Sequence, residues 1–279
     1  MKFTKMQGAG NDYIYVNCFE ETVKNPNEAA VKVSDRHFGI GSDGLVLIEP
    51  SAVADFKMDI YNSDGSQAKM CGNATRCVAK YVYDNQMTQK DEISLETLSV
   101  VKYIKMFIEN GKVKSAAVNM GAPVTEPEKI PVRLDGDIVL NRTIEAGGKE
   151  YAVTCVSMGN PHCVVFIADT DSLKIDDTGP LFENNRLFPD RINTEFIQLV
   201  DANTFKMRVW ERGAGETLAC GTGACAAAVA AILNGYCKKD EDISVVLLGG
   251  VLTIRWDSKS NDVYMTGPAE TVCTGEIDL

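Results

Sequence analysis

The same alternation of apolar and polar positions occurs in two short segments of the chain. Residues 56–62, FKMDIYN, and 205–211, FKMRVWE, place an apolar side chain at every second position, which predicts a half-buried strand. A loop rich in Gly, Ser, Asp or Glu follows each segment, and then a Cys-Gly pair. The stretches that come next, CVAKYVYDNQ and ACAAAVAAILNG, lack glycine and proline until Gly235 and predict helices, the second one ending at that glycine.

The remaining pattern predicts more strands than helices. ISLET is expected to be a strand, and SVVKYIKMFIENGKVKSAAV a hairpin that turns at Asn110 and Gly111. SVVLLGGVLTIRW and VYMTG predict a further set of paired strands near the end of the chain. One more helix is expected to begin at Asn25 and Pro26, with asparagine as its cap, and to end near Gly39.

The two strand-loop-helix segments are related by one fixed offset of 149 residues. Between the stretches that start at Phe56 and Phe205, 5 of 17 aligned positions are identical, where about one is expected for unrelated sequences of average composition. The same offset places Gly10 and Asn11 on Gly159 and Asn160. A duplication is therefore the favoured interpretation, although a single domain with a coincidental local match stays open.

We accordingly expect an α+β fold of two pseudo-symmetric domains, each a mixed or antiparallel sheet curled, barrel-like, around its central helix. The N-terminal half, residues 1–119, carries Cys71, and the C-terminal segment of about 269–279 could return to it. The C-terminal half, residues 120–268, carries Cys220. The junction is expected near residues 120–131, where GAPVTEPEKIP collects three prolines.

Charge and cysteine usage narrow the class of protein. The net charge of −11 disfavours a nucleic-acid partner or an anionic membrane surface. The longest apolar run, Ala224 to Leu233, is about half of the ~20 residues that cross a bilayer. The first residues show no apolar signal segment, and the nine cysteines are an odd number, so we expect free thiols in a reducing cytoplasm.

A cysteine at the start of each predicted helix suggests acid–base chemistry. The first N–H groups of a helix lack partners within it, which favours a thiolate and predicts a thiol pKa lowered from about 8.5 toward neutrality. The same N–H groups can bind a carboxylate. If the two halves face each other, Cys71 and Cys220 would flank one cleft. One sulfur could then remove an α-proton while the other delivers a proton to the opposite face, which inverts the carbon.

Other interpretations of the cysteines are less well supported. Zinc and thioredoxin-like chemistry both favour Cys-x-x-Cys, whereas the spacings here are Cys71 to Cys77 and Cys220 to Cys225. We therefore expect no metal site. Gly221, Gly223 and Ala226 fit G-x-G-x-x-A, but a polar loop, not a buried strand, precedes them. The other cysteines are expected to be small buried hydrophobes.

Six motifs together resemble the diaminopimelate epimerase family over almost the whole chain. They are FTKMQGAGNDY, GIGSDG, YNSDGSQAKMCGN, MGNPHCV, RINTEF and ERGAGETLACGTGA. The resemblance implies cofactor-independent epimerisation of LL-2,6-diaminopimelate to meso-diaminopimelate by two cysteines, in the synthesis of lysine and peptidoglycan precursors. It also implies a small-molecule substrate and a homodimer, while the negative net charge gives the expectation of no nucleic-acid or membrane partner.

The resemblance also assigns site residues. It implies Cys71 and Cys220 as proton donor and acceptor, with His162 and Glu211 assisting them. The implied substrate contacts are Asn11, Asn62, Gly72, Asn73, Asn160, Asn193, Glu211, Arg212, Gly221 and Thr222. Ala74 and Gly44 depart from residues common in the family, glycine and glutamine respectively, so no side-chain contact is expected at Gly44.

Two other functions remain as alternatives. A proline or hydroxyproline racemase-type enzyme shares the two-cysteine plan, but RINTEF and ERGAGET disfavour it. A non-catalytic relative that only binds an amino acid is disfavoured because both cysteines are present.

Overall fold

The computed structural model describes all residues, 1–279, and divides the chain into two compact units. Unit 1 comprises Met1–Asn119 together with Thr266–Leu279, and unit 2 comprises Met120–Met265. The chain leaves unit 1 within strand β8 (Lys112–Gly121) and re-enters it within β17 (Val263–Pro268). None of the helices is both long and apolar enough to span a membrane.

Unit 1 is built on one mixed sheet. Its other strands are β1 (Lys2–Gly8), β2 (Asn11–Asn17), β3 (Gly44–Glu49), β4 (Phe56–Asn62), β5 (Gln67–Ala68), β6 (Glu92–Glu96), β7 (Val101–Glu109) and β18 (Glu270–Glu276). They pair in the order β18-β1-β2-β3-β4-β6-β7-β8, with β5 added alongside β4. The pairs β2–β3 and β4–β6 are parallel, and the other pairs are antiparallel.

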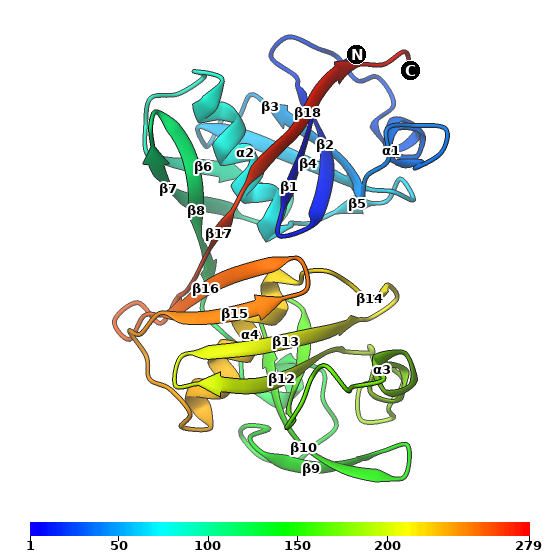
Figure 1. Ribbon diagram of the computed structural model, residues 1–279, viewed down its shortest axis with the longest axis vertical. Coiled ribbons are helices and arrows are strands. Elements are labelled where there is room, and N and C mark those ends of the chain that lie inside the picture. Colours follow the sequence, from blue (N-terminus) through cyan, green and yellow to red (C-terminus); the bar gives the residue numbers. More distant parts are fainter. The chain divides into compact units, whose positions relative to one another are not determined.

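Two helices complete unit 1, namely α1 (Pro26–Ser34) and α2 (Gly72–Asp84). Helix α2 packs against β1, β2 and β7, strands from opposite parts of the sheet, because the sheet curls around it (Figure 1). The predicted curl is therefore confirmed. Strands β8 and β18 are not paired with each other, however, so the sheet is not closed into a barrel.

Unit 2 repeats this plan. Its strands are β9 (Arg142–Ala146), β10 (Lys149–Ser157), β11 (Pro161–Phe166), β12 (Asn193–Asp201), β13 (Thr204–Glu211), β14 (Gly215–Glu216), β15 (Ile243–Leu247) and β16 (Gly250–Trp256). They pair in the order β9-β10-β11-β12-β13-β15-β16, with parallel pairs at β11–β12 and β13–β15. The helices are α3 (Ile175–Glu183), α4 (Gly221–Leu233) and a short 3₁₀ turn, Pro127–Lys129.

The helices of the two units correspond residue for residue. Helices α1 and α3 are both 9 residues long and begin 149 residues apart, and α2 and α4 are both 13 residues long with the same offset. Helix α4 is rich in buried alanine and packs against β10, β11, β12, β15 and β16. A helix that is apolar on all sides requires such enclosure, and its small side chains let the strands approach closely.

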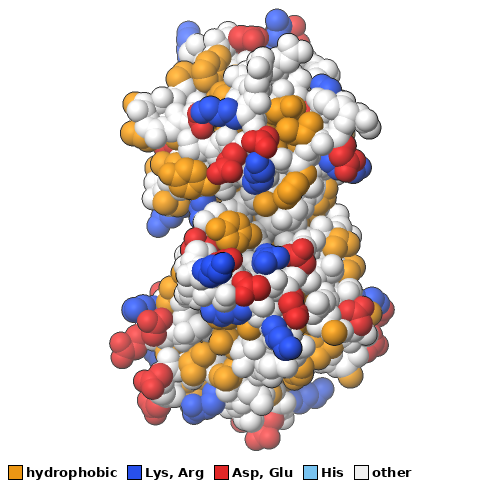
Figure 2. Space-filling view, turned by 90° about the vertical axis from the view of Figure 1, so that its left-hand side faces the viewer, with side chains coloured by type: hydrophobic (Ala, Val, Ile, Leu, Met, Phe, Trp, Pro, Cys, Tyr) orange, Lys and Arg blue, Asp and Glu red, His pale blue; other side chains and the backbone are white.

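Most of the expected local signals are present. Asn110 and Gly111 both have positive φ, 51° and 75°, which confirms the predicted turn between β7 and β8. Gly235, with φ of 78°, follows the end of α4 as predicted. Acidic and basic side chains alternate over the face shown in Figure 2, with hydrophobic ones between them.

Two helix predictions need correction. Helix α1 ends at Ser34 and not near Gly39, because Asp35 Oδ1 accepts bonds from the backbone N–H groups of His37 and Phe38 and forms a turn there. The Asn25 side chain donates to Glu28 and does not cap the backbone. Helix α3 was not predicted, because its Gly179-Pro180 pair is typical of a break in a helix.

The contact of α3 with β13 gives a stability prediction for unit 2. A Cβ added at Gly179 would lie 2.3 Å from Cδ2 of Trp210, so alanine there forces the helix and strand apart. We expect Gly179→Ala to lower the free energy of unfolding by about 1–3 kcal/mol, which outweighs the helix propensity that alanine gains. Urea unfolding followed by tryptophan fluorescence measures this, because both tryptophans, Trp210 and Trp256, lie in unit 2.

The matched control is Asp177→Ala, an exposed position on the same helix. It should change the unfolding midpoint little. An unchanged midpoint for Gly179→Ala would show that α3 does not need this close approach.

Candidate active site

The residues implied as a site are divided between the two units. Unit 1 holds the Cys71 cluster, which consists of Asn11, Asn62, Cys71, Gly72 and Asn73. Unit 2 holds the Cys220 cluster, which consists of Asn160, His162, Asn193, Glu211, Arg212, Cys220, Gly221 and Thr222. Each cluster is gathered around the first turn of its enclosed helix.

Cys71 is the N-cap residue of α2, with extended backbone angles of φ −140° and ψ 119°. Its Sγ donates to Oδ1 of Asn11 at 3.3 Å, and the side-chain nitrogen of Asn73 points to the same oxygen at 3.4 Å. Asn11 is the first residue of β2. The start of this strand therefore places an amide oxygen beside the thiol.

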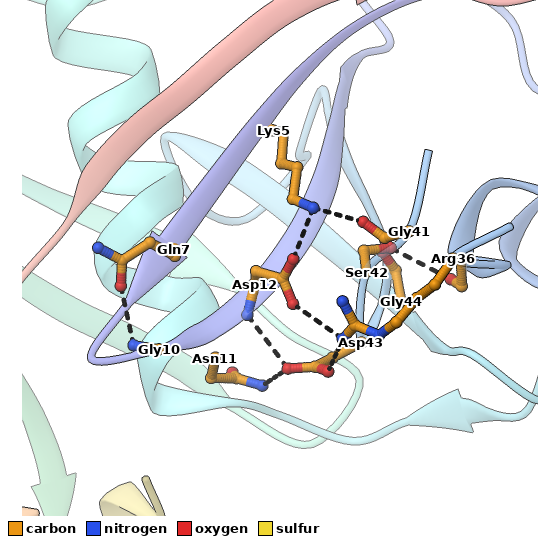
Figure 3. A network of polar contacts seen from close by, with 11 residues as sticks. Lys5, Gln7, Gly10, Asn11, Asp12, Arg36, Gly41, Ser42, Asp43 and Gly44 are labelled. Atoms are coloured by element: carbon orange, nitrogen blue, oxygen red, sulfur yellow. Dashed lines mark hydrogen bonds and ion pairs between the residues drawn. The ribbon is translucent and has the colours of Figure 1, made fainter. Parts of the chain in front are cut away.

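The Asn11 amide is held from its other end by a network of charged side chains (Figure 3). Its Nδ2 donates to Oδ2 of Asp43 at 2.8 Å, and the backbone N–H of Asp12 donates to the same carboxylate at 3.1 Å. Arg36 lies 3.2 Å from the other Asp43 oxygen, and Lys5 pairs with Asp12 at 2.9 Å. The network joins β1 and β2 to the segment that follows α1.

The side chains of Asn73 and Asn62 have partners within unit 1. Asn73 is buried, and its Oδ1 accepts from Nη2 of the fully buried Arg76 at 2.8 Å. Arg76 also donates to the backbone oxygen of Pro268 at 3.2 Å, which attaches α2 to the C-terminal segment. Asn62 ends β4 opposite Gly44 and donates to Oγ of Ser66 at 3.0 Å. Sequence alone did not single out Arg76, because nothing local distinguishes a buried arginine from an exposed one.

Cys220 is the N-cap residue of α4, and only 5% of it is exposed. Its Sγ accepts from the backbone N–H of Gly223 at 3.4 Å and lies 3.5 Å from Oγ1 of Thr222. A Cβ on Gly223 would lie 3.2 Å from this sulfur and 2.6 Å from Oε1 of Glu195. Glycine at position 223 therefore lets the helix start close over both groups.

His162 lies on β11, fully buried, beside its parallel neighbour β12. Its Nδ1 is 2.7 Å from Oε1 of Glu195, and its Nε2 is 3.0 Å from Oδ1 of Asn160. The other Glu195 oxygen, Oε2, is buried without a hydrogen-bond partner. A buried carboxylate in contact with an imidazole fixes the orientation of the ring.

The charges around Cys220 contradict the expected effect of the helix start. Burial, and then the charges of Glu211 and Glu195, raise the pKa of Cys220 well above its usual value. The Gly223 N–H and Thr222 lower it, but by less. The predicted drop toward neutrality is therefore wrong for Cys220, because desolvation and two nearby carboxylates outweigh one turn of helix N–H groups. These effects favour the neutral thiol of Cys220 over its thiolate.

Glu211, at the end of β13, is also affected by burial. Desolvation raises its pKa, whereas the hydroxyl of Thr217, the charge of His162 and the thiol of Cys220 lower it. A carboxyl with a raised pKa can accept and return a proton more readily at neutral pH. Glu211 therefore has the chemistry of a base for the neighbouring thiol.

A hydrogen bond joins Asn193, at the start of β12, to Arg212 in the turn after β13. Asn193 is buried, donates to the oxygen of Pro161 at 3.2 Å and accepts from the backbone N–H of Arg212 at 3.0 Å. The Arg212 side chain donates to the oxygen of Asp190 at 2.8 Å. Glu183, at the end of α3, holds the same turn through Gly213 N at 2.8 Å and Trp210 Nε1 at 2.7 Å.

Three of these neighbours were missed from the sequence. Asp43 lies in the motif GIGSDG and Glu195 in the motif RINTEF. Their positions in these motifs could have identified them as neighbours of the site. Glu183 had no such signal. What these carboxylates contact depends on loops and strands that are distant in the sequence.

The two clusters differ although the units repeat. At the 149-residue offset, Asn62 falls on Glu211, and Tyr13 falls on His162. Tyr13 is kept neutral, because burial above all raises its pKa. The Cys220 cluster therefore carries titratable neighbours where the Cys71 cluster carries neutral ones.

All nine cysteines are unpaired, and no group of three or more His, Cys, Asp or Glu side chains is arranged to hold a metal ion.

The family model and the most similar relatives in sequence agree on one family. The family model described as diaminopimelate epimerase matches residues 3–126 and 154–272. Diaminopimelate epimerase of Acetivibrio thermocellus is 59% identical, covering 100% of this chain and 99% of the relative, and that of Methanococcus maripaludis is 57% identical, covering 100% of both. A solved structure of a probable proline racemase from Agrobacterium radiobacter K84 has a TM-score of 0.71 at 12% identity, covering 100% of this chain and 93% of the other. This last likeness shows the fold alone.

The electrostatics of Cys220 predict its reactivity. Because a nearby negative charge holds its pKa up, Glu211→Gln should lower that pKa and make Cys220 react with iodoacetamide at lower pH than in the unaltered protein. Peptide-resolved mass spectrometry measures the extent of alkylation. A range of about pH 6 to 10 covers both sides of the usual thiol pKa.

The control variant is Glu216→Gln, which removes a carboxylate that pairs with Arg208 and not with Cys220. Its alkylation curve should match that of the unaltered protein. Coincident curves for Glu211→Gln and the unaltered protein would mean that Glu211 does not control the thiol.

Proposed function

This chain belongs to the diaminopimelate epimerase family, and from this premise we propose that Cys71 and Cys220 exchange the α-proton of the substrate. The protein is an isomerase that interconverts LL- and meso-diaminopimelate, a reaction of lysine biosynthesis. The observation that carries the proposal is that both enclosed helices, α2 and α4, begin at a cysteine N-cap. Inversion needs two groups, because one removes a proton from one face of the carbon and the other supplies a proton to the opposite face.

The Cys220 cluster supplies the base in one direction of the reaction. Cys220 begins as a neutral thiol and passes its proton to the Glu211 carboxylate, which forms the thiolate and a carboxylic acid. The thiolate then takes the α-proton, and the electron pair of the C–H bond stays on the substrate as a carbanion. His162, held by Glu195, stabilises negative charge on Glu211 and so tunes its readiness to accept.

The Cys71 cluster supplies the acid in the same direction. The S–H of Cys71, bonded to Asn11, gives its proton to the carbanion, and the electron pair forms the new C–H bond. Cys71 ends as the thiolate, Cys220 as the thiol and Glu211 as the carboxylic acid. Glu211 then loses its proton to solvent and Cys71 regains one from solvent, which restores the starting state. In the reverse reaction the two cysteines exchange these roles, so the direction of the reaction decides which of them donates the proton.

Backbone groups at the two helix starts bind the carboxylate next to the reacting carbon. The N–H groups of Gly72, Asn73, Gly221 and Thr222 lie in the first turns, where no intrahelical oxygen accepts from them. The second amino-acid end of the substrate is bound by the side chains of Arg212, Asn11, Asn62, Asn160 and Asn193. The reaction uses no cofactor in this proposal.

A proline-racemase activity has only the shared fold in its favour. The solved relative with that description is 12% identical, whereas relatives described as diaminopimelate epimerase are above 50%. Proline also lacks the second amino-acid end that Arg212 and the asparagines are proposed to bind.

Replacement of each thiol tests the two-cysteine mechanism. In deuterated water, the protein should convert LL-diaminopimelate to the meso form with deuterium at the α-carbon. Cys71→Ala and Cys220→Ala should each reduce the rate by about 10²–10⁴-fold or more, because each removes one of two obligatory proton carriers. Nuclear magnetic resonance of the α-position and chiral chromatography measure both quantities.

The matched controls are Cys77→Ala and Cys225→Ala, which alter buried cysteines farther along the same two helices. These variants should keep most of the activity per folded molecule. A near-normal rate in Cys71→Ala or Cys220→Ala would overturn the mechanism, and turnover of proline in place of diaminopimelate would select the racemase.

We further propose that the chain acts as a homodimer in the cytoplasm. The family resemblance supports the dimer, and the nine unpaired cysteines suit a reducing compartment. Size-exclusion chromatography with light scattering should give twice the mass of one chain. The mass of a single chain would contradict the dimer.

A further inference from the structure

The charged network of unit 1 reaches Asn11 through Asp43 (Figure 3), and Asn11 in turn accepts from the thiol of Cys71. We infer that Asp43 is a positioning residue for Cys71, because it orients the Asn11 amide so that its oxygen, and not its nitrogen, faces the sulfur. The functional consequence of this inference rests on the proposed role of Cys71 as a proton donor. The orientation itself is independent of that role.

An asparagine amide can face a thiol in two ways. Its oxygen only accepts hydrogen bonds, and its nitrogen only donates them. Asn11 Nδ2 is 2.8 Å from Oδ2 of Asp43, and an ionised carboxylate only accepts, so the nitrogen must face Asp43. The oxygen is then left 3.3 Å from Sγ of Cys71, where it also accepts from Asn73.

The surroundings of Asp43 keep it as an acceptor. The Asp12 N–H and the Arg36 guanidinium both direct N–H groups at its oxygens, at 3.1 and 3.2 Å. Burial raises the pKa of Asp43, and the charge of Asp12 acts in the same direction, but the Asp12 N–H, Asn11 and Arg36 oppose them. Lys5 pairs with Asp12 at 2.9 Å, so the two carboxylates face two cations.

The orientation of the Asn11 amide influences the protonation state of Cys71 before the reaction. An oxygen that accepts from S–H favours the neutral thiol, whereas an N–H directed at the sulfur would favour the thiolate. Tyr13, whose hydroxyl lies by Asn11 and Cys71, is neutral and adds no charge to this balance. The Asn11 oxygen therefore favours the neutral thiol of Cys71, which carries the proton that it is to deliver.

In unit 2, no carboxylate corresponds to Asp43, so the orientation of Asn11 by Asp43 is not a general consequence of the fold. At the 149-residue offset, Asp43 falls on Ile192, which has no polar group with which to orient an amide. The equivalent asparagine, Asn160, places its oxygen 3.0 Å from Nε2 of His162 instead. Asp43 thus gives the Cys71 cluster a partner that the Cys220 cluster lacks.

The test measures the titration of Cys71 without substrate. In Asp43→Asn, position 43 can present an N–H group to Asn11, so the Asn11 amide can turn over, accept from that group and direct its own N–H at the sulfur. We expect iodoacetamide alkylation of the Cys71 peptide to move to lower pH and to become about 3–10-fold faster at neutral pH. Epimerisation should lose kcat more than it changes KM.

Loss of the Asp43 charge would also favour a thiolate, so two further variants separate charge from orientation. Asp12→Asn removes a carboxylate of the same network that has no bond to the Asn11 side chain, and it should shift the Cys71 curve much less. In an Asn11→Ala background, Asp43→Asn should shift the Cys71 curve much less than it does with Asn11 present, because only the effect of the lost charge remains. An equal shift with and without Asn11 would overturn the inference.

Failure of the inference can be distinguished from failure of the proposed function. If Cys71→Ala remains active, the mechanism is wrong, although the Cys71 titration can still respond to Asp43. If Cys71→Ala is inactive but Asp43→Asn leaves the Cys71 curve unchanged, the inference alone is wrong. Should Asp43→Asn not fold, Asp43→Ser removes the same acceptor-only group with a smaller side chain, and the same outcomes decide.

Discussion

A helix that begins inside a curled sheet is the constraint on which the rest of the structure depends. The first N–H groups of α2 and α4 have no oxygens within their own helices, and the surrounding strands restrict the access of water to them. Whatever side chain occupies the N-cap is therefore held among polar groups from neighbouring strands. In both units that side chain is a cysteine, so the same packing that stabilises the helix also sets the state of a thiol.

Duplication supplied two such helix starts, and the neighbouring residues made them chemically different. Around Cys220, the buried His162 and Glu195 and the half-buried Glu211 form a group that can exchange protons. Around Cys71, amides and a neutral tyrosine orient the sulfur, and the charged residues Asp43 and Asp12 act from one step farther away. A symmetric fold can thus carry out a reaction whose two half-steps require opposite protonation states.

Local pattern was a good guide to the elements and to the two cysteines. The hairpin at Asn110-Gly111, strand β4 and helices α2 and α4 lie where the periodicity predicted them. Helix α3 was missed because Gly179 and Pro180 are locally typical of a break, whereas packing of Gly179 on Trp210 keeps the helix in place. A local rule cannot include a stabilising contact made by a residue on another strand.

The sequence by itself determined the family, the repeat and the position of a cysteine before each enclosed helix, because these are properties of residue order. Only the tertiary structure decided the burial and the neighbouring charges of each thiol. Glu195 and Glu211 reach Cys220 from two different strands, and their charges together with burial raise the pKa that the helix start alone was expected to lower. A pKa depends on every charge and every lost water around the group, and these neighbours are brought together only by folding.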